Sequence, residues 1–310
     1  MKSFNTKNLI EIKKGTNNRV FKGEYKNKEI VIKKFSNSKN SKNKNFIEFK
    51  FTKIFYKSKN SSVAKPLKIS KKYNYAIYEF LKGEKIKKVT NKHIKLCAKF
   101  INEIQIKNRH LLNLPMARES CLSLKDHIKL VTNKLKKISL VKNNKKLHLF
   151  IKNKFTPSWL SFIKNFRLIY RDELNYKVKK KNLIISPSDF NFNNILLYKK
   201  KLFFFDFEYS GLDDCRKLIC DFVCQPDIKI NNNQKKLFIK KLNQKYIIKK
   251  NIIEDLIVLH KFKWCLILLN IYVSNKIKKK QFDKNNYSNK SQLKKSINYY
   301  NKNKLYKYGN

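Results

Sequence analysis

The sequence predicts an α+β fold, with a small antiparallel sheet near the N-terminus and a mainly helical remainder. Three observations support this prediction. Residues 9–35 contain short runs of branched and aromatic side chains separated by turns. Apolar residues recur at helical spacing over most of residues 91–274. Two short strand-like runs interrupt that helical pattern between residues 183 and 205.

The N-terminal strands give one lysine a distinctive position. Lys33 lies near the end of a strand and shares a face with Val31, whereas Lys34 faces the other way, because side chains alternate along a strand. A turn is expected at Gly15-Thr16-Asn17-Asn18. Three strands are expected in this part of the chain: Leu9–Ile12, Val20–Tyr25 and Glu29–Phe35.

A helix and a further strand follow. Phe46–Tyr56 has apolar residues along one side and contains a single acid, Glu48. Tyr75–Phe80 is expected to be a strand, and Leu81-Lys82-Gly83 ends it. This break separates a sheet-rich part over residues 1–82 from a helical part over residues 83–310.

The helical part offers several start signals. Ser120 and Ser123 are both plausible N-caps of one helix, and Asp126 lies in its first turns. Pro157 is well placed to open another helix. Helices are expected at Asn91–Arg109, Ser120–Ile138, Leu147–Lys154, Ser158–Lys180, Gln234–Gln244 and Ile252–Ser274.

Residues 183–221 hold the main candidate functional residues. Asp189 follows a short apolar strand, Asn194 lies five residues further on, and Asp206 ends a second strand. The two strands are expected at Leu183–Ile185 and Leu202–Phe205. A hairpin through residues 199–201 is expected to bring their ends together. Two carboxylates and one carboxamide at one rim would suit Mg²⁺, which prefers oxygen ligands.

The order of these residues carries a resemblance to a known family. Asp-x-x-x-x-Asn followed by an Asp after a strand is the order found in protein kinases. Taken singly, Asp189 and Asn194 are better explained as turn and capping residues, and only the three residues together favour a functional site. Together, Ser186–Asn194 and Phe205–Glu208 resemble the aminoglycoside phosphotransferase and choline kinase group. Most members of that group have His-Gly-Asp where this chain has Pro187-Ser188-Asp189.

The resemblance implies a protein-kinase-like fold of two lobes, an N-lobe over residues 1–82 and a C-lobe over residues 83–310, with the nucleotide between them. It implies that Asp189 is catalytic and orients or deprotonates the acceptor hydroxyl. It implies that Asn194 and Asp206 hold Mg²⁺ on the phosphates of ATP or GTP. The protein would then be a small-molecule kinase with an alcohol group as acceptor.

The resemblance also implies residues that bind the nucleotide. Lys33 would bind the α- and β-phosphates, and Glu48 would pair with Lys33. The backbone at Glu79, Phe80 and Leu81 would form the hinge that contacts the purine ring. In so basic a chain, an ordinary solvated lysine and a surface glutamate remain the alternatives for Lys33 and Glu48.

The charge is extreme, with a formal net charge of +53 over 310 residues. Such a charge attracts nucleic acids, anionic membranes and acidic substrates. All but six of the 74 basic residues are lysine, and Asn, Ile and Phe are also abundant. Codons rich in A and T explain this composition, and phosphate-reading surfaces usually favour arginine. No specific nucleic-acid partner is therefore expected.

The acceptor is expected to be a small molecule with a hydroxyl group. Aminoglycosides are polycations, and a pocket for them needs several carboxylates, whereas the chain has only 21 Asp and Glu. A sugar or a related surface-polysaccharide metabolite is therefore favoured. An aminoglycoside-type antibiotic kinase and a nucleotide-binding pseudokinase with a regulatory role are the alternatives.

Cysteines and targeting signals point to a cytoplasmic protein. Six cysteines lie mostly in apolar, helix-like surroundings, which is typical of reduced, buried thiols. Cys215, Cys220 and Cys224 form a loose cluster without the paired spacing of a metal site. The first residues lack an apolar signal region. The apolar segment Leu256–Val273 contains His260 and Lys263, so it is expected to be a buried helix, not a membrane span.

Overall fold

The structure is a computed structural model that describes residues 7–14, 18–36, 43–58, 62–105, 113–141, 144–242, 250–277 and 289–309. The turn expected at Gly15-Thr16-Asn17, and the ends expected for helices at 106–109 and 243–244, lie outside these residues. The chain divides into two compact units, which are described separately. Unit 1 is Met1–Arg118, Lys180–Leu218 and Ile230–Tyr246, and unit 2 is Glu119–Lys179, Ile219–Lys229 and Ile247–Asn310. The lobe boundary expected at residue 82 stays a prediction.

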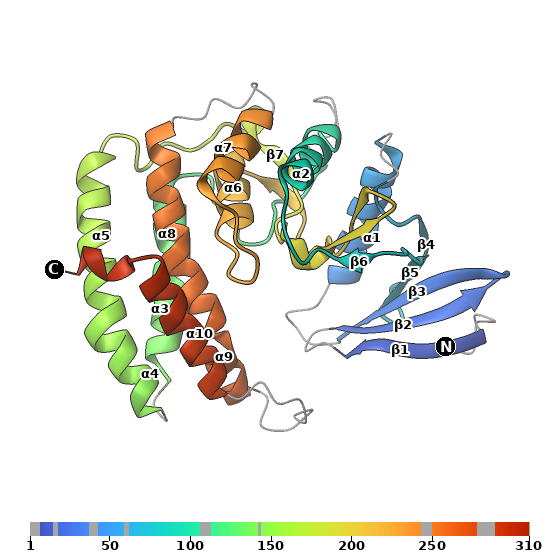
Figure 1. Cartoon of the computed structure of the whole chain (residues 1–310), viewed down its shortest axis with the longest axis horizontal. Helices are drawn as coiled ribbons and strands as arrows, with labels where there is room; N and C mark the ends of the chain where they lie inside the picture. The colour runs from blue at the N-terminus through green and yellow to red at the C-terminus, as the bar shows by residue number, and fades with distance from the viewer. Residues whose placement is uncertain are drawn as a thin grey trace. The chain divides into compact units, whose positions relative to one another are not determined.

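Unit 1 contains a five-stranded antiparallel sheet with the strand order β1-β2-β3-β5-β4 (Figure 1). Its strands are β1 (Lys7–Lys14), β2 (Asn18–Tyr25), β3 (Lys28–Phe35), β4 (Pro66–Ser70) and β5 (Tyr75–Glu79). The three strands expected within residues 9–35 and the one expected at 75–80 are confirmed. Alternation along β3 puts Ile30 and Ile32 into one apolar cluster and Phe35 into another, on the face that also carries Lys33.

Among the described residues, three α-helices lie wholly within unit 1. α1 (Lys44–Lys57) contacts β4 and β5 and buries Phe51 and Phe55 completely. α2 (Asn91–Glu103) starts with a capping box at Thr90 and packs against α7 (Asn232–Lys241). Phe100 of α2 stacks on Phe204, with 3.9 Å between the ring centroids. This stack fixes α2 against the strand that leads to Asp206.

The second group of strands differs from the expected hairpin. β6 (Glu84–Lys85), β8 (Ile195–Tyr198) and β9 (Lys201–Phe204) form one sheet, and β7 (Ile184–Ser186) pairs with β10 (Gly211–Asp213). The expectation that a hairpin joins the strand before Asp189 to the strand before Asp206 is therefore wrong. The turn joins β8 to β9, because Lys199 and Lys200 both adopt positive φ, of 45° and 63°, as a two-residue hairpin turn requires.

β10 is also covered by a segment from earlier in the chain. Leu212 N–H donates to Pro115 C=O at 2.8 Å, and Ala117 N–H donates to Leu212 C=O at 2.9 Å. The two backbones approach so closely at Gly211 that a Cβ there would lie 2.3 Å from Ala117 N and 2.5 Å from the Met116 carbonyl carbon. Only glycine fits at this position without a backbone shift.

Unit 2 is helical. Its helices are α3 (Leu124–Ser139), α4 (Lys145–Phe150), the π-helical turn η3 (Ile151–Phe155), α5 (Thr156–Ile169), α8 (Lys250–Leu268), α9 (Asn270–Ile277), α10 (Asn289–Lys302) and the short η6 (Leu305–Tyr308). α8 packs against both α3 and α10 (Figure 1). α6 (Cys215–Val223) begins in unit 1 and ends in unit 2. Ser123, not Ser120, caps α3, in a capping box with Asp126.

Two helix boundaries differ from expectation. Residues 145–169 form one continuous helical run through η3, not two separate helices. The helix expected to reach Lys180 ends at Ile169, because the following segment turns back along the start of α3. There, Val178 N–H donates to Leu122 C=O at 2.8 Å and Lys125 N–H donates to Leu174 C=O at 3.0 Å.

All six cysteines are buried as thiols outside any disulfide, as expected. Burial raises the pKa of the Cys97 thiol well above its usual value, so this thiol stays neutral and unreactive. Within the described ranges, no helix combines the length and the apolar character needed to span a bilayer.

We expect Gly211→Ala to destabilise the protein by about 1–3 kcal/mol, because the new methyl group meets backbone atoms that cannot rotate away. The free energy of unfolding in urea would measure this loss. Lys236→Ala, on the exposed side of α7, is the control and should change little. Equal stability of the two variants would contradict the close approach at β10.

Candidate functional site

A buried lysine lies at the centre of the candidate site. Lys33 Nζ is 2.6 Å from Glu48 Oε2, 2.5 Å from Asp206 Oδ1 and 3.8 Å from Glu208 Oε2. Only 9% of the Lys33 side chain is exposed, whereas Lys34 is exposed to solvent. The structure therefore brings together three of the residues that the sequence singles out, and it selects Lys33 over its neighbour.

Each member of this group comes from a different element. β3 directs Lys33 to the face shared with Phe35, whose ring centroid lies 5.0 Å from Nζ. α1 supplies Glu48 from its second turn, and Asp206 follows β9. Asp206 has a φ of 71°, a left-handed conformation that is uncommon for a residue other than glycine.

The next residue anchors this unusual turn. Phe207 is buried, and its ring packs edge-on against Phe55 of α1 with 4.8 Å between centroids. The same ring lies 6.3 Å from Phe100 of α2. Packing of Phe207 between two helices thus holds Asp206 in place against Lys33.

A second buried ion pair lies beside the first. Lys44, the first residue of α1, donates to Glu208 Oε1 at 2.9 Å and to Tyr209 Oη at 2.8 Å. Asn18 Nδ2, at the start of β2, donates to Glu208 Oε2 at 2.8 Å. Sequence reasoning missed Lys44, Asn18 and Tyr209 and gave Glu208 no role of its own. No local signal marks Lys44 among so many lysines.

The loop after β7 holds Asp189 by two carboxamides. Asn191 Nδ2 donates to Asp189 Oδ1 at 2.7 Å, and Asn194 Nδ2 donates to Asp189 Oδ2 at 3.1 Å. Asn194 closes the 3₁₀ turn η5 (Phe192–Asn194), which Asn191 caps. Since its nitrogen faces Asp189, the carboxamide oxygen of Asn194 is the atom able to bind a cation.

The backbone also brings Asn194 close to Asp206. Phe205 N–H donates to Asn194 C=O at 3.2 Å, so Asn194 lies opposite the residue that precedes Asp206. The two residues predicted to hold a metal are therefore neighbours across the β8–β9 hairpin.

The loop departs from the usual family sequence at a strained position. Ser188 has a φ of 64°, in the left-handed region that glycine adopts more readily than other residues. Its amide donates to Ser186 Oγ at 3.0 Å, and its hydroxyl donates to Arg118 C=O at 3.3 Å. These bonds compensate for the serine that stands where most relatives in the resemblance have glycine.

Tyr209 lies near the carboxylates of both Glu208 and Asp189. Burial raises the pKa of its hydroxyl well above the usual value, and the nearby charges of Glu208 and Asp189 raise it further. The guanidinium of Arg118 lies 4.7 Å from the ring centroid. The Tyr209 hydroxyl therefore stays protonated at neutral pH and can donate a hydrogen bond.

The charges of the cluster shift the pKa values of its members. Burial alone would lower the pKa of Lys33, but the carboxylates of Glu48, Asp206 and Glu208 reverse this effect and raise it above its usual value. Burial raises the pKa of Glu48 to about 8, and the charges of Asp206 and Glu208 act in the same direction. Three carboxylates face two ammonium groups here, so one carboxyl group retains its proton more readily.

A group of oxygens in this cluster could bind a cation. Within the described residues, Glu48, Asp206 and Glu208 each offer an oxygen within 4.8 Å of the others. The ammonium group of Lys33 already lies among these oxygens. Of the three, Asp206 is the most accessible, with 24% of its side chain exposed, and Asn194 lies next to it.

The predicted hinge follows β5. Glu79 lies opposite Ile30 of β3 in the sheet, and Ile30 precedes Lys33 by three residues in the same strand. Glu79 N–H donates to Lys65 C=O at 2.9 Å, and Phe80 N–H donates to Glu29 C=O at 3.1 Å. Among the described residues, no backbone carbonyl accepts from Leu81 N–H, so this amide is available to a ligand.

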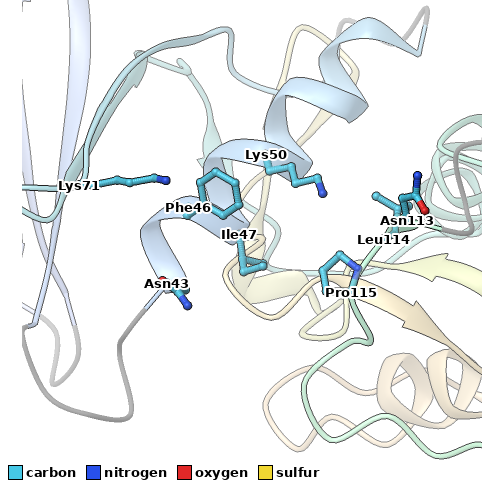
Figure 2. A pocket seen from close by; sticks show the side chains of 8 residues that line it. All are labelled: Asn43, Phe46, Ile47, Lys50, Lys71, Asn113, Leu114 and Pro115. Carbon is cyan, nitrogen blue, oxygen red and sulfur yellow. The ribbon is translucent and has the colours of Figure 1, made fainter.

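A separate open hollow lies beside α1 (Figure 2). None of the predicted site residues lines it. It is lined by Asn43, Phe46, Ile47, Lys50, Lys71, Asn113, Leu114 and Pro115. The ring of Phe46 lies 4.7 Å from Lys71 Nζ at one side of the hollow.

Polar residues are also buried in unit 2. His127 and His260 are fully buried, and His127 Nδ1 lies 2.8 Å from His260 Nε2. Asp221 forms an ion pair with Lys263 and lies 3.5 Å from His260 Nδ1. His260 is thus a core histidine, and Asp221 has partners within its own unit.

Comparisons with known proteins identify the fold. No family model and no curated protein matches the sequence. A spectinomycin phosphotransferase in complex with ADP and spectinomycin matches with a TM-score of 0.66 at 13% identity, over 97% of this chain and 91% of its own. An ADP-bound aminoglycoside phosphotransferase matches with a TM-score of 0.62 at 14% identity, over 98% and 96%. A choline kinase from Streptococcus pneumoniae matches with a TM-score of 0.61 at 10% identity, over 97% and 95%.

The chain has the protein-kinase-like fold of these small-molecule kinases. The predicted resemblance and the predicted α+β fold class are therefore confirmed. At these identities the likeness establishes the fold, and the roles of individual residues depend on the geometry described above.

We expect Lys33→Met to destabilise the protein by about 3–5 kcal/mol at pH 8, because the buried carboxylates of Glu48 and Glu208 and the partly buried carboxylate of Asp206 lose their central cation. The loss should shrink at pH 5, where the remaining carboxyl groups can take up protons. Urea unfolding at both pH values would measure this. Lys34→Met, on the exposed face of the same strand, should stay within about 0.5 kcal/mol of the wild type. Similar losses for both variants would contradict the assignment of the buried face.

We expect the wild-type protein to lose stability as the pH rises from about 5 to 8. The pKa of Glu48 is about 8 in the folded protein and near its usual value of 4.5 in the unfolded chain. Between these values the folded state holds more protons, so raising the pH favours unfolding, by at most about 1.4 kcal/mol per pH unit. Glu48→Gln should flatten this dependence in thermal melts. Parallel curves for both proteins would show that Glu48 does not titrate in this range.

Proposed function

We propose that the protein is a phosphotransferase that moves the γ-phosphate of ATP or GTP to a hydroxyl group of a small molecule. The observation that carries this proposal is the buried Lys33, held at once by Glu48 of α1 and by Asp206 after β9. An ordinary solvated lysine needs neither partner. In phosphoryl transfer, a lysine fixed in this way binds the nucleotide phosphates.

Mg²⁺ fits the oxygens at the end of the β8–β9 hairpin. The carboxylate of Asp206 and the carboxamide oxygen of Asn194 are hard oxygen ligands from neighbouring positions, which suits a cation that also binds phosphates. The bound ion would neutralise charge on the phosphates during transfer. We infer that Asp206 and Asn194 hold the ion and that Glu208, next to both Lys33 and Lys44, orients the lysines.

Asp189 is the proposed catalytic residue. The carboxamides of Asn191 and Asn194 fix both of its oxygens, so the carboxylate has a defined direction. We infer that it orients the acceptor hydroxyl and accepts its proton during transfer. The backbone at Glu79, Phe80 and Leu81 would bind the purine, and backbone contacts of this kind admit ATP and GTP alike.

For the acceptor, we favour a neutral or anionic hydroxyl compound such as a sugar. The chain has only 21 Asp and Glu, and Glu48, Asp206 and Glu208 are already engaged with lysines. A cationic acceptor is the second candidate, because structures of similar fold include a spectinomycin phosphotransferase and choline and ethanolamine kinases.

A transfer screen with radiolabelled ATP and GTP against sugars, aminoglycosides, choline and ethanolamine would test the proposal. We expect Mg²⁺-dependent transfer to at least one hydroxyl compound. Transfer to choline, ethanolamine or aminoglycosides alone would replace the sugar by the cationic acceptor. Nucleotide binding without transfer or hydrolysis would instead indicate a pseudokinase.

With the acceptor found, we expect Asp189→Asn to lower kcat by about 10²–10⁴-fold, because the carboxamide keeps the shape of the side chain but is not a base. Its affinity for Mg-ATP should stay within a few-fold of the wild type. Asp206→Asn should show the opposite pattern, with a clear loss of Mg²⁺-dependent nucleotide affinity by calorimetry. An Asp189→Asn variant with near-normal kcat would refute the proposed role.

A further inference from the structure

The exposed side of α5 carries large aliphatic residues beside cations. Leu160, Leu168 and Ile169 are 61%, 67% and 67% exposed. Lys164 and Arg167 are also exposed. Residues 160, 164, 167 and 168 follow helical spacing and lie on one side of α5. Ile169 is the last residue of the helix and lies about 180° around the axis from Leu160, so it is not part of this side. Residues 160, 164, 167 and 168 are called the α5 patch.

The opposite side of α5 is fully engaged in the core of unit 2. Trp159, Phe162 and Phe166 are buried. The rings of Trp159 and Phe162 lie 5.5 Å and 5.6 Å from that of Phe262 in α8. This packing fixes the rotation of the helix, so the patch cannot turn inward to bury its aliphatic groups.

The whole helical run is basic. Residues 145–169 contain six Lys and Arg and no Asp or Glu, and all six cations are exposed. The first acids, Asp172 and Glu173, follow the end of α5. Single exposed aliphatic residues are common on soluble proteins, but Leu160 and Leu168 flank two exposed cations on one side of an acid-free helix, so apolar and basic groups share one surface.

We propose that the α5 patch binds the surface of a bilayer that contains anionic lipids. The aliphatic groups would enter the boundary between headgroups and acyl chains, and Lys164 and Arg167 would lie at the phosphate level. Such a helix lies in the plane of the interface and does not cross the bilayer. The proposal is independent of the phosphotransferase activity.

Other occupants use only part of the patch. Nucleic acid would pair with the cations but would gain little from the side chains of Leu160 and Leu168. A second copy of the chain would bring an equally basic patch against this one, so the cations would repel each other across a two-fold contact. An anionic bilayer complements both the charge and the apolar groups.

Co-sedimentation of the full-length protein with vesicles of phosphatidylcholine, with and without phosphatidylglycerol, tests the proposal. We expect binding only to the anionic vesicles, with weakening at high salt. Lys164→Glu with Arg167→Glu should weaken it at least about 25-fold, at roughly fivefold per basic residue. Leu160→Ser with Leu168→Ser should weaken it about tenfold or more.

Matched controls separate the patch from the general charge of the protein. Lys236→Glu with Lys240→Glu changes the net charge equally, at exposed positions of α7. Ile10→Ser removes an equally exposed aliphatic residue of β1. Both controls should keep most of the binding. Losses equal to those of the patch variants, or no binding to anionic vesicles by the wild type, would overturn the proposal.

A fluorescent label reports where the patch lies. All six native cysteines are buried, so Leu168→Cys introduces a selectively reactive thiol for a polarity-sensitive dye. The dye at position 168 should shift to the blue with anionic vesicles, and a dye at Lys236→Cys should not. An unshifted dye at position 168 would overturn the proposal. A second pair of results would also overturn it. In that case the charge variant loses binding to a polynucleotide, while the aliphatic variant still binds vesicles normally.

Discussion

The ammonium group of Lys33 is removed from water, and this constrains much of unit 1. A buried cation is tolerated only when carboxylates or other acceptors surround it. Glu48 can do so only if α1 packs closely on the sheet, and Asp206 only if the chain turns sharply after β9. The rings of Phe55, Phe100 and Phe207 supply the packing that holds both elements there. Apolar packing and ion pairing thus depend on each other at this site.

The charge balance of the cluster suits the ligand that we propose for it. Lys33 and Lys44 face Glu48, Asp206 and Glu208, so the carboxylates exceed the ammonium groups by one. A nucleotide that arrives with Mg²⁺ brings anionic phosphates to the lysines and a cation to the carboxylates. Burial raises the pKa of Glu48, and the excess of carboxylates acts in the same direction.

Local spacing explains which parts could be predicted from the sequence. The alternation of side chains in β3 selected Lys33, and the distance from Asp189 to Asn194 is set within one loop. The pair of Lys44 and Glu208 joins residues 164 positions apart, and no local pattern marks it. The hairpin turn was located correctly at residues 199–201, but its first strand, β8, was missed because it is only four residues long and follows directly after Asn194. The exposed stripe of α5 follows from packing against α8, which sequence periodicity alone does not orient.

The two carboxylates proposed for catalysis and metal binding both depend on left-handed backbone positions. Asp206 itself has positive φ, and Ser188 has positive φ immediately before Asp189. Neither is glycine, and conformations of this kind cost about 1–3 kcal/mol each. Hydrogen bonds from Ser188 and the packing of Phe207 offset that cost. Because each strained residue is fixed by its neighbours, the carboxylates are held in place before any ligand binds, which is what transfer by positioning and charge neutralisation requires.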